Sequence, residues 1–121
     1  MAKKILVVDD EPDILKSVEF ILKRSGYEVF TACDGEDGLE MVKKNMPDLI
    51  LLDLRLPGKD GFEVCCELKT EEKHKHIPII LLTASAGIGR KEFEKCKYDS
   101  FVLKPFQYND LLGKIKEFLP E

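Results

Sequence analysis

The sequence predicts an α/β fold in which helices cover both faces of a parallel sheet. Two observations support this prediction. Apolar runs of strand length alternate with amphipathic segments of helix length five times along the chain, as in repeated β–α units. Three of these runs are almost purely aliphatic, as expected of strands buried on both faces. Because crossovers between parallel strands are right-handed, the strand order must reverse beside the first strand, and an active crevice opens there.

The expected strands are short runs rich in Val, Ile and Leu. They lie at Lys4–Val8, Glu28–Thr31, Leu49–Leu52, Ile79–Leu82 and Ser100–Leu103. The second and fifth runs contain polar residues, which favours positions at the edges of the sheet.

Helices are expected in the segments between the strands. The first follows Pro12, a residue suited to a helical first turn, and Gly26 ends it where a left-handed cap is needed. The later helices are expected at about Gly38–Asn45, Phe62–Lys73, Arg90–Lys97 and Asn109–Leu119. The segment at Arg90–Lys97 is short and has the weakest apolar pattern.

Composition and charge fit a single domain over residues 1–121. The chain of 121 residues is 44% hydrophobic and 35% charged, which is typical of a globular domain with a solvated exterior. Its net charge of −4 argues against binding to nucleic acid or to anionic lipid. It has no long apolar stretch and no signal-peptide core before the first acids, so we expect a cytoplasmic protein.

The cysteines and histidines do not predict a metal site. None of the four cysteines, Cys33, Cys65, Cys66 and Cys96, has the spacing of metal ligands. In a cytosolic chain we expect them to be reduced and to act as small hydrophobic residues. His74 and His76 lie in a charged stretch that is typical of a solvated loop, and no third ligand is indicated.

Three carboxylates stand where apolar runs end: Asp9 and Asp10 after the first run, and Asp53 after the third. A single strand-end Asp is often only a cap or a turn former. If the two runs are neighbouring parallel strands, however, all three acids meet at one point and repel one another unless a cation neutralises them. Oxygen ligands with room for water and phosphate favour Mg²⁺.

Two further polar residues end the fourth and fifth strands: Thr83 in IILLTAS and Lys104 in FVLKPF. Together with VVDDEP and LLDLRLPGKDG, these motifs make the chain resemble the receiver domain of two-component response regulators, in particular the single-domain chemotaxis regulators. The resemblance covers essentially the whole chain. It implies a flavodoxin-like (βα)5 three-layer sandwich with a five-stranded parallel sheet of order 2-1-3-4-5.

The resemblance also implies a role for each residue of this constellation. Asp53 would accept a phosphoryl group from a phosphohistidine, and Lys104, before a cis peptide bond to Pro105, would pair with the phosphoryl oxygens. Thr83 would donate its hydroxyl to the same group. Magnesium would be held by Asp10 and Asp53, by Asp9 directly or through water, and by the backbone carbonyl of Arg55. These assignments agree with the chemistry, because phosphoryl transfer needs a nucleophile and positive charge on the equatorial oxygens.

Several further expectations follow from the resemblance. Phe101 occupies the position of an aromatic switch, and Gly58 and Gly61 are expected to form a turn that needs positive φ. The expected docking surface spans Lys95–Phe101 and Gln107–Lys114. The chain departs from the commonest receiver pattern at Lys97 and Tyr98, where many receivers have Gly-Ala, and it carries Arg55 and Ser85 at positions that influence the lifetime of the phosphorylated state. The sequence does not predict the sign of that influence.

The main hypothesis is a phosphorylation-controlled switch rather than a turnover enzyme. Its expected partners are a sensor histidine kinase or phosphotransfer protein and a downstream effector, and the domain would be a monomer or an activation-dependent dimer. One alternative is a degenerate receiver that acts as a binding scaffold, although such domains usually lose the acids or the lysine. Another is a magnesium-dependent phosphatase, whose class typically has Asp where this chain has Arg55. A flavodoxin-type cofactor binder is disfavoured because the acids after the first strand would repel a phosphate. Whether the domain acts alone or within a larger regulator stays open.

Overall fold

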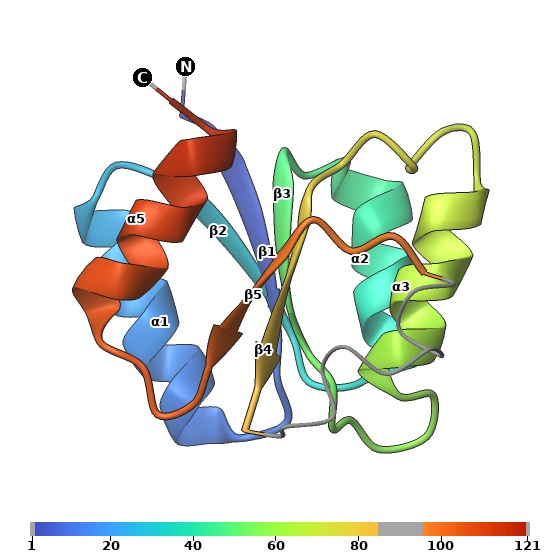
Figure 1. Ribbon diagram of the computed structural model, residues 1–121, viewed down its shortest axis with the longest axis horizontal. Coiled ribbons are helices and arrows are strands. Elements are labelled where there is room, and N and C mark those ends of the chain that lie inside the picture. Colours follow the sequence, from blue (N-terminus) through green and yellow to red (C-terminus); the bar gives the residue numbers. More distant parts are fainter. Residues whose placement is uncertain (1, 85–95, 121) are drawn as a thin grey trace.

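The structure, a computed structural model, describes residues 2–84 and 96–120 of the chain. Five parallel strands form one sheet in the order β2-β1-β3-β4-β5, which confirms the predicted flavodoxin-like topology (Figure 1). The strands are β1 Lys4–Val8, β2 Glu28–Ala32, β3 Leu49–Asp53, β4 Ile79–Thr83 and β5 Ser100–Leu103. The two strands with polar residues, β2 and β5, lie at the edges as expected.

Helices cover both faces of the sheet. The described helices are α1 Pro12–Arg24, α2 Gly35–Asn45, α3 Gly61–Thr70 and α5 Tyr108–Phe118. Helices α1 and α5 pack on one face and α2 and α3 on the other, so the domain has three layers (Figure 1). The helix expected at Arg90–Lys97 falls largely outside the described residues.

Two helix boundaries differ from the predicted ones by three residues, whereas the start of α3 and both ends of α5 differ by one. Helix α2 begins three residues early because Asp34 caps it, accepting a hydrogen bond from the Asp37 N–H at 2.7 Å. Helix α3 ends at Thr70 rather than Lys73, because the chain turns there and the N–H groups of His74 and Lys75 both donate to the Glu71 carbonyl.

The alternation of side chains along each strand divides the core into two clusters. Leu6, Val8, Ile50 and Leu52 face α2 and α3, whereas Ile5, Val7, Leu49 and Leu51 face α1 and α5. All eight are at most 1% exposed, which explains why β1 and β3 are aliphatic except for Lys4 at the start of β1 and Asp53 at the end of β3.

Truncating this core should cost much of the stability of the domain. Leu51 is fully buried, so Leu51→Ala should lower the free energy of unfolding by about 2–5 kcal/mol through lost burial and a residual cavity. Leu103, which is 52% exposed on the edge strand, is the matched control and should cost less than about 1 kcal/mol when changed to Ala. Urea unfolding of both variants measures the difference, and equal losses would contradict this account of the core.

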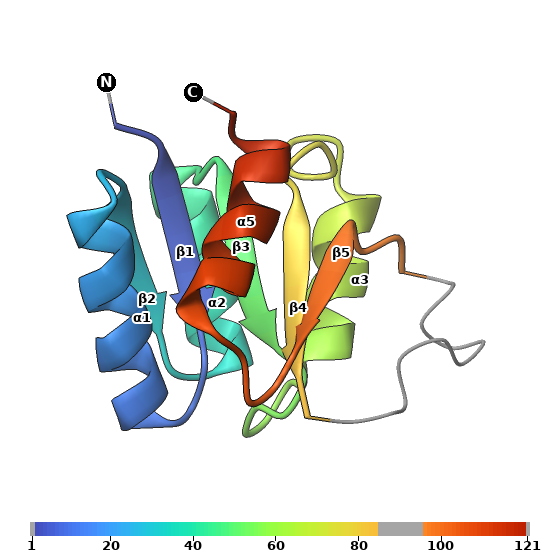
Figure 2. The ribbon, with the colours of Figure 1, turned by 60° about the vertical axis from the view of Figure 1, so that its left-hand side comes forward.

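The start of β1 and the end of α5 lie side by side. Ala2 and Lys3 line a hollow together with Leu119 and Pro120, and the ribbon views place both ends of the chain at the same end of the sheet (Figures 1 and 2). The carboxyl ends of the strands point the opposite way.

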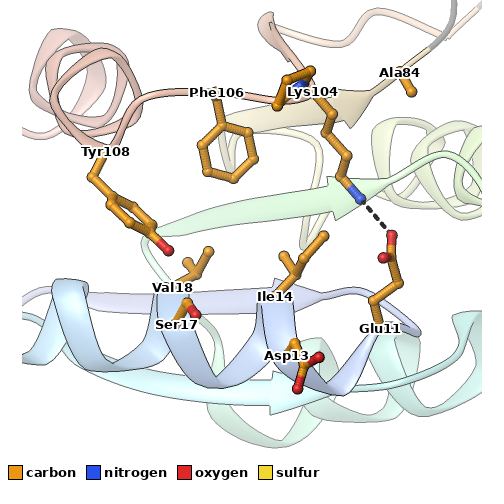
Figure 3. A pocket seen from close by; sticks show the side chains of 10 residues that line it. Glu11, Asp13, Ile14, Ser17, Val18, Ala84, Lys104, Phe106 and Tyr108 are labelled. Carbon is orange, nitrogen blue, oxygen red and sulfur yellow. Dashed lines mark hydrogen bonds and ion pairs between the residues drawn. The ribbon is translucent and has the colours of Figure 1, made fainter.

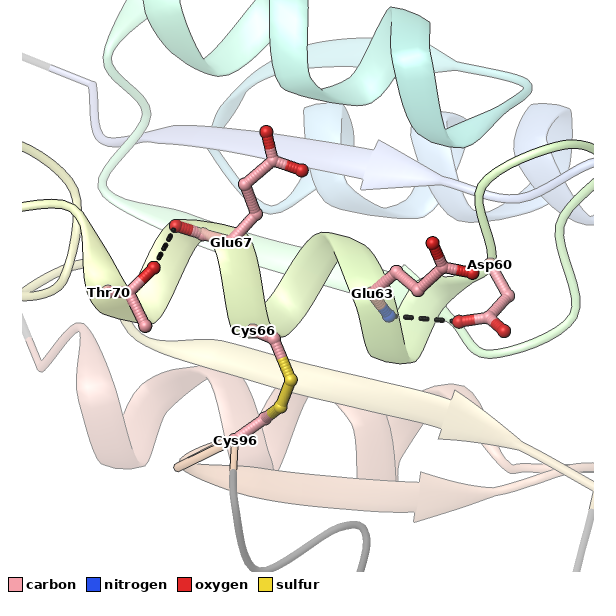
Figure 4. The surroundings of a disulfide bond; sticks show 6 residues. All are labelled: Asp60, Glu63, Cys66, Glu67, Thr70 and Cys96. Carbon is pink, nitrogen blue, oxygen red and sulfur yellow. Dashed lines mark hydrogen bonds between the residues drawn. A yellow bond between two sulfur atoms is a disulfide. The ribbon is translucent and has the colours of Figure 1, made fainter.

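The cysteines correct one prediction. Cys66 on α3 and Cys96, just before β5, form a disulfide, although all four cysteines were expected to be reduced (Figure 4). Thirty residues separate the two cysteines, and spacing in the sequence gives no sign that the fold brings them together. Cys33 and Cys65 are free as expected, the first exposed and the second buried.

Burial makes Cys65 a poor nucleophile. Desolvation raises the pKa of its thiol to about 11. At pH 8 only about one Cys65 thiol in a thousand is then ionised, so the exposed Cys33 should react with iodoacetamide much faster. Peptide mapping after timed alkylation of the folded protein measures the two rates. Comparable rates, or preferential labelling of Cys65, would be inconsistent with its buried position.

Among the described residues, no helix is both long enough and apolar enough to cross a membrane.

Candidate functional site

The sheet brings the predicted site residues together at the carboxyl ends of its strands. Val8 is paired with Leu52 in the register of β1 and β3, so Asp9 and Asp53 follow on neighbouring strands. Thr83 ends β4 opposite Leu103, and Lys104 follows directly. The sequence-based expectation of convergence at the reversal of strand order is thereby met.

Lys104 connects the two buried acids. Its ammonium donates to Asp9 Oδ2 at 2.9 Å and to Asp53 Oδ2 at 3.0 Å, and it lies 3.5 Å from Glu11 Oε1. The backbone holds this arrangement, because the Lys104 N–H donates to the Thr83 carbonyl at 2.8 Å. The peptide bond between Lys104 and Pro105 is cis, as the sequence resemblance implied.

Backbone N–H groups orient both carboxylates. Asp9 Oδ1 accepts from the Glu11 N–H at 2.9 Å, and Asp53 Oδ1 accepts from the Arg55 N–H at 3.0 Å. Asp9 is fully buried and Asp53 is 4% exposed. Each carboxylate therefore has one oxygen fixed by the backbone and one directed to Lys104.

Burial and ion pairing have opposite effects on the pKa values of Asp53 and Lys104. Desolvation raises the pKa of Asp53 above its ordinary value, while the Arg55 N–H and Lys104 act against this rise. Burial lowers the pKa of Lys104, but hydrogen bonds to Asp9 and Asp53 outweigh it, so that the pKa of the ammonium is raised. Lys104 is therefore held in its charged form.

The acids form a candidate cation site. Asp9, Asp10, Glu11 and Asp53 each have a carboxylate oxygen within 4.8 Å of the others. Within the part of the chain that the structure describes, Lys104 pairs with three of these carboxylates, those of Asp9, Glu11 and Asp53. The four acids together outnumber this one positive charge when ionised, and the ligands that they offer are all oxygens. A hard divalent cation fits such a donor set.

Four further residues need separate comment. Glu11 belongs to the cluster but was not predicted as a ligand; its position directly after the acid pair was the available signal. Arg55 is exposed and donates its N–H to Asp53, and metal ligation by its carbonyl stays a prediction. Thr83 is buried at the end of β4, and its role also stays a prediction. Ser85 lies outside the described residues.

The loop after Asp53 packs tightly under the site. Gly58 has φ of 71°, as expected for its turn, but Gly61 does not have positive φ, so that part of the prediction was wrong. Gly61 is needed for a different reason: a Cβ there would overlap the Asp53 carbonyl oxygen and lie 2.8 Å from Leu54 Cα. It lets α3 begin directly beneath the end of β3.

A hollow of about 500 Å³ opens beside Lys104, between α1 and the segment that leads into α5. Figure 3 shows Lys104 and Glu11 meeting at one end of it, while Phe106 and Tyr108 face α1 at the other end. The exposed, small Ala84 also lines this hollow. The hollow therefore borders the site at Lys104 and Glu11.

These features define an α/β protein with an acidic crevice at the reversal of its strand order. The family model of the response regulator receiver domain matches residues 5–116. The chain therefore belongs to the response regulator receiver domains of two-component systems.

Solved structures agree with this assignment. The chemotaxis response regulator CheY4 of Vibrio cholerae is 30% identical, with a TM-score of 0.91 over 98% of this chain and 99% of that one. A CheY-like receiver domain protein from Methanospirillum hungatei is 34% identical, with a TM-score of 0.86 over 97% of this chain and 93% of that one. The receiver domain of the sensor histidine kinase PA1611 from Pseudomonas aeruginosa is 30% identical, covers 100% of both chains at a TM-score of 0.89, and has a magnesium ion coordinated in its active site cleft.

Proposed function

We propose that this receiver domain accepts a phosphoryl group on Asp53 from a phosphohistidine donor and thereby controls a partner protein. The observation that carries the proposal is the arrangement of Asp53: a buried carboxylate, fixed by a backbone N–H and facing an ammonium and three further acids. Such an arrangement supplies the nucleophile and the charge that phosphoryl transfer requires.

Different residues of the site would supply the nucleophile and the positive charge. Asp53 Oδ1 is occupied by the Arg55 N–H, so we assign the attack on phosphorus to Oδ2. The new O–P bond replaces the N–P bond of the donor, and the imidazole nitrogen leaves with the electron pair. Lys104, already 3.0 Å from Oδ2, is placed to neutralise a phosphoryl oxygen. Magnesium held by Asp9, Asp10 and Asp53 would supply further positive charge to the phosphoryl oxygens.

Phosphorylation would alter the partner-binding surface at β5. Phe101 is half-buried against the cluster shared with α2 and α3, and a groove of about 640 Å³ lies between β5 and α5. We propose that Thr83, drawn to the phosphoryl group, lets Phe101 move and so alters this groove, where the partner docks. The described part of the expected docking surface covers residues 96–101 and 107–114, and of these Ser100, Phe101, Gln107, Asn109, Asp110, Gly113 and Lys114 line the groove.

The alternatives are less well supported. A degenerate binding scaffold has no need of Asp9, Asp53 and Lys104 in mutual hydrogen-bonding distance. A turnover phosphatase of the aspartyl-phosphate class typically has a general acid where this chain has the exposed Arg55. We therefore propose slow, self-directed hydrolysis of the phosphorylated domain rather than turnover of an external substrate.

The proposal is tested by incubating the protein with a small phosphodonor and either Mg²⁺ or EDTA. One adduct of about 80 Da should form with Mg²⁺ and not with EDTA, as seen by intact mass spectrometry at neutral pH. Absence of the adduct under both conditions would refute phosphoacceptor function. Sustained release of phosphate from a phosphomonoester would favour the phosphatase instead.

A further inference from the structure

Helix α3 holds the segment before β5 at two points. Cys66 and Lys69 lie three residues apart on α3 and therefore on neighbouring positions of one face. Cys66 forms the disulfide with Cys96, and Lys69 Nζ contacts Asp99 Oδ2 at 2.7 Å (Figure 4 shows the disulfide). One of these two connections is covalent and depends on the oxidation state of the thiols.

The contacts of Asp99 fix the start of β5 without the disulfide. Asp99 Oδ2 also accepts from the Ile79 N–H at 2.8 Å, and the Asp99 N–H donates to the Ile79 carbonyl at 2.9 Å. The central strands do not depend on the disulfide either, because β3 and β4 are buried along their whole length and β1 is buried from Ile5 to Val8. The domain therefore has the contacts to stay folded when the disulfide is open.

The two cysteines differ in exposure. Cys96 is 2% exposed, whereas Cys66 is half-buried, so a thiol reagent reaches Cys66 first. Their Cα atoms are 4.6 Å apart, a separation that suits a disulfide without movement of the backbone. The neighbouring Cys65 points into the core and is not part of the pair.

We propose that Cys66 and Cys96 form a redox-controlled crosslink that sets the mobility of β5. A small-molecule disulfide such as oxidised glutathione is the oxidant. The Cys66 thiolate attacks it and releases one glutathione thiolate; the Cys96 thiolate then displaces the second glutathione and closes the crosslink. Two protein thiols are oxidised and one glutathione disulfide is reduced to two thiols, and excess reduced glutathione reverses both steps.

The crosslink restrains β5 because one of its two cysteines, Cys96, lies shortly before this strand. Cys96, Tyr98 and Phe101 pack in the same cluster, which also contains Cys66. A covalent bond at Cys96 therefore restrains the chain just before Phe101. The crosslink itself is independent of the proposed function, whereas its effect on signalling rests on the proposed switch at Phe101.

The test is a redox titration of the whole protein. After equilibration in buffers of graded reduced and oxidised glutathione, free thiols are trapped with a maleimide and counted by intact mass. Two thiols should disappear together within the range of these buffers. A pair that never closes, or one that stays closed in excess reduced glutathione, would overturn the proposal. Cys33→Ser, which removes the exposed free thiol, should leave the titration midpoint unchanged; Cys66→Ser should abolish the transition.

Two measurements report how the crosslink affects the fold. Closing the crosslink should raise the Tm by roughly 5–15 °C and slow amide exchange in β5 more than in β2, the opposite edge strand. Equal exchange in both redox forms would refute control of β5. Both forms are also incubated with phosphodonor and Mg²⁺: if neither takes up a phosphoryl group, the proposed function fails while the redox titration still stands.

Discussion

Asp53→Asn is expected to abolish phosphoryl uptake from a small donor. The substitution keeps the size of the side chain and an oxygen that can accept the Arg55 N–H, but it removes the anionic nucleophile. The substitution removes only the nucleophile and leaves the other acids and Lys104 in place. The loss of uptake should therefore be complete rather than partial. Intact mass spectrometry after incubation with Mg²⁺ measures the adduct.

The matched control is Asp37→Asn, which neutralises an exposed acid in the first turn of α2. It should leave uptake at the level of the unmodified protein. An adduct that persists in Asp53→Asn would place the phosphorylated residue elsewhere and would remove the central assignment of the site.

Lys104→Met is expected to affect both stability and transfer. It leaves Asp9 and Asp53, both buried, without their shared cation, and this should cost about 2–4 kcal/mol in the absence of divalent ions. The rate of phosphoryl uptake should fall by about a hundredfold to a thousandfold, because a preorganised positive charge is lost. Urea unfolding and timed mass spectrometry give the two values.

Two controls separate these effects. Magnesium should restore part of the lost stability, because a bound cation again neutralises the acids. Stability lost through a cavity would not be recovered in this way. Adding Asp53→Asn to Lys104→Met should also recover stability, because one of the unpaired charges is removed. Lys116→Met, at an exposed site on α5, should change neither property. If Lys104→Met unfolds like the unmodified protein in EDTA, the ion pairs contribute little to stability.

The strands and the site residues could be predicted because each follows a local rule. Aliphatic runs mark strands buried on both faces, and an acid or lysine directly after such a run must stand at one edge of a parallel sheet. This is why Asp9, Asp53 and Lys104 were found by sequence alone, and the structure joins them by hydrogen bonds.

Other features depend on contacts that no local pattern encodes. The pairing of Cys66 with Cys96 follows from the packing of α3 against the chain before β5. Gly61 was attributed to backbone conformation, whereas it is the close approach of α3 to the Asp53 carbonyl that excludes a side chain. The early start of α2 did have a local signal, the capping side chain of Asp34, which the helix prediction did not use.

The position of the two chain ends has a practical consequence. Ala2 and Pro120 line one hollow, at the end of the sheet remote from the acidic crevice. A fluorescent protein or a surface tether joined at either terminus would leave the crevice uncovered. Paired fluorophores at residues 2 and 120 would serve as a short-distance reference in energy-transfer measurements, against which movement of a third label on β5 can be calibrated.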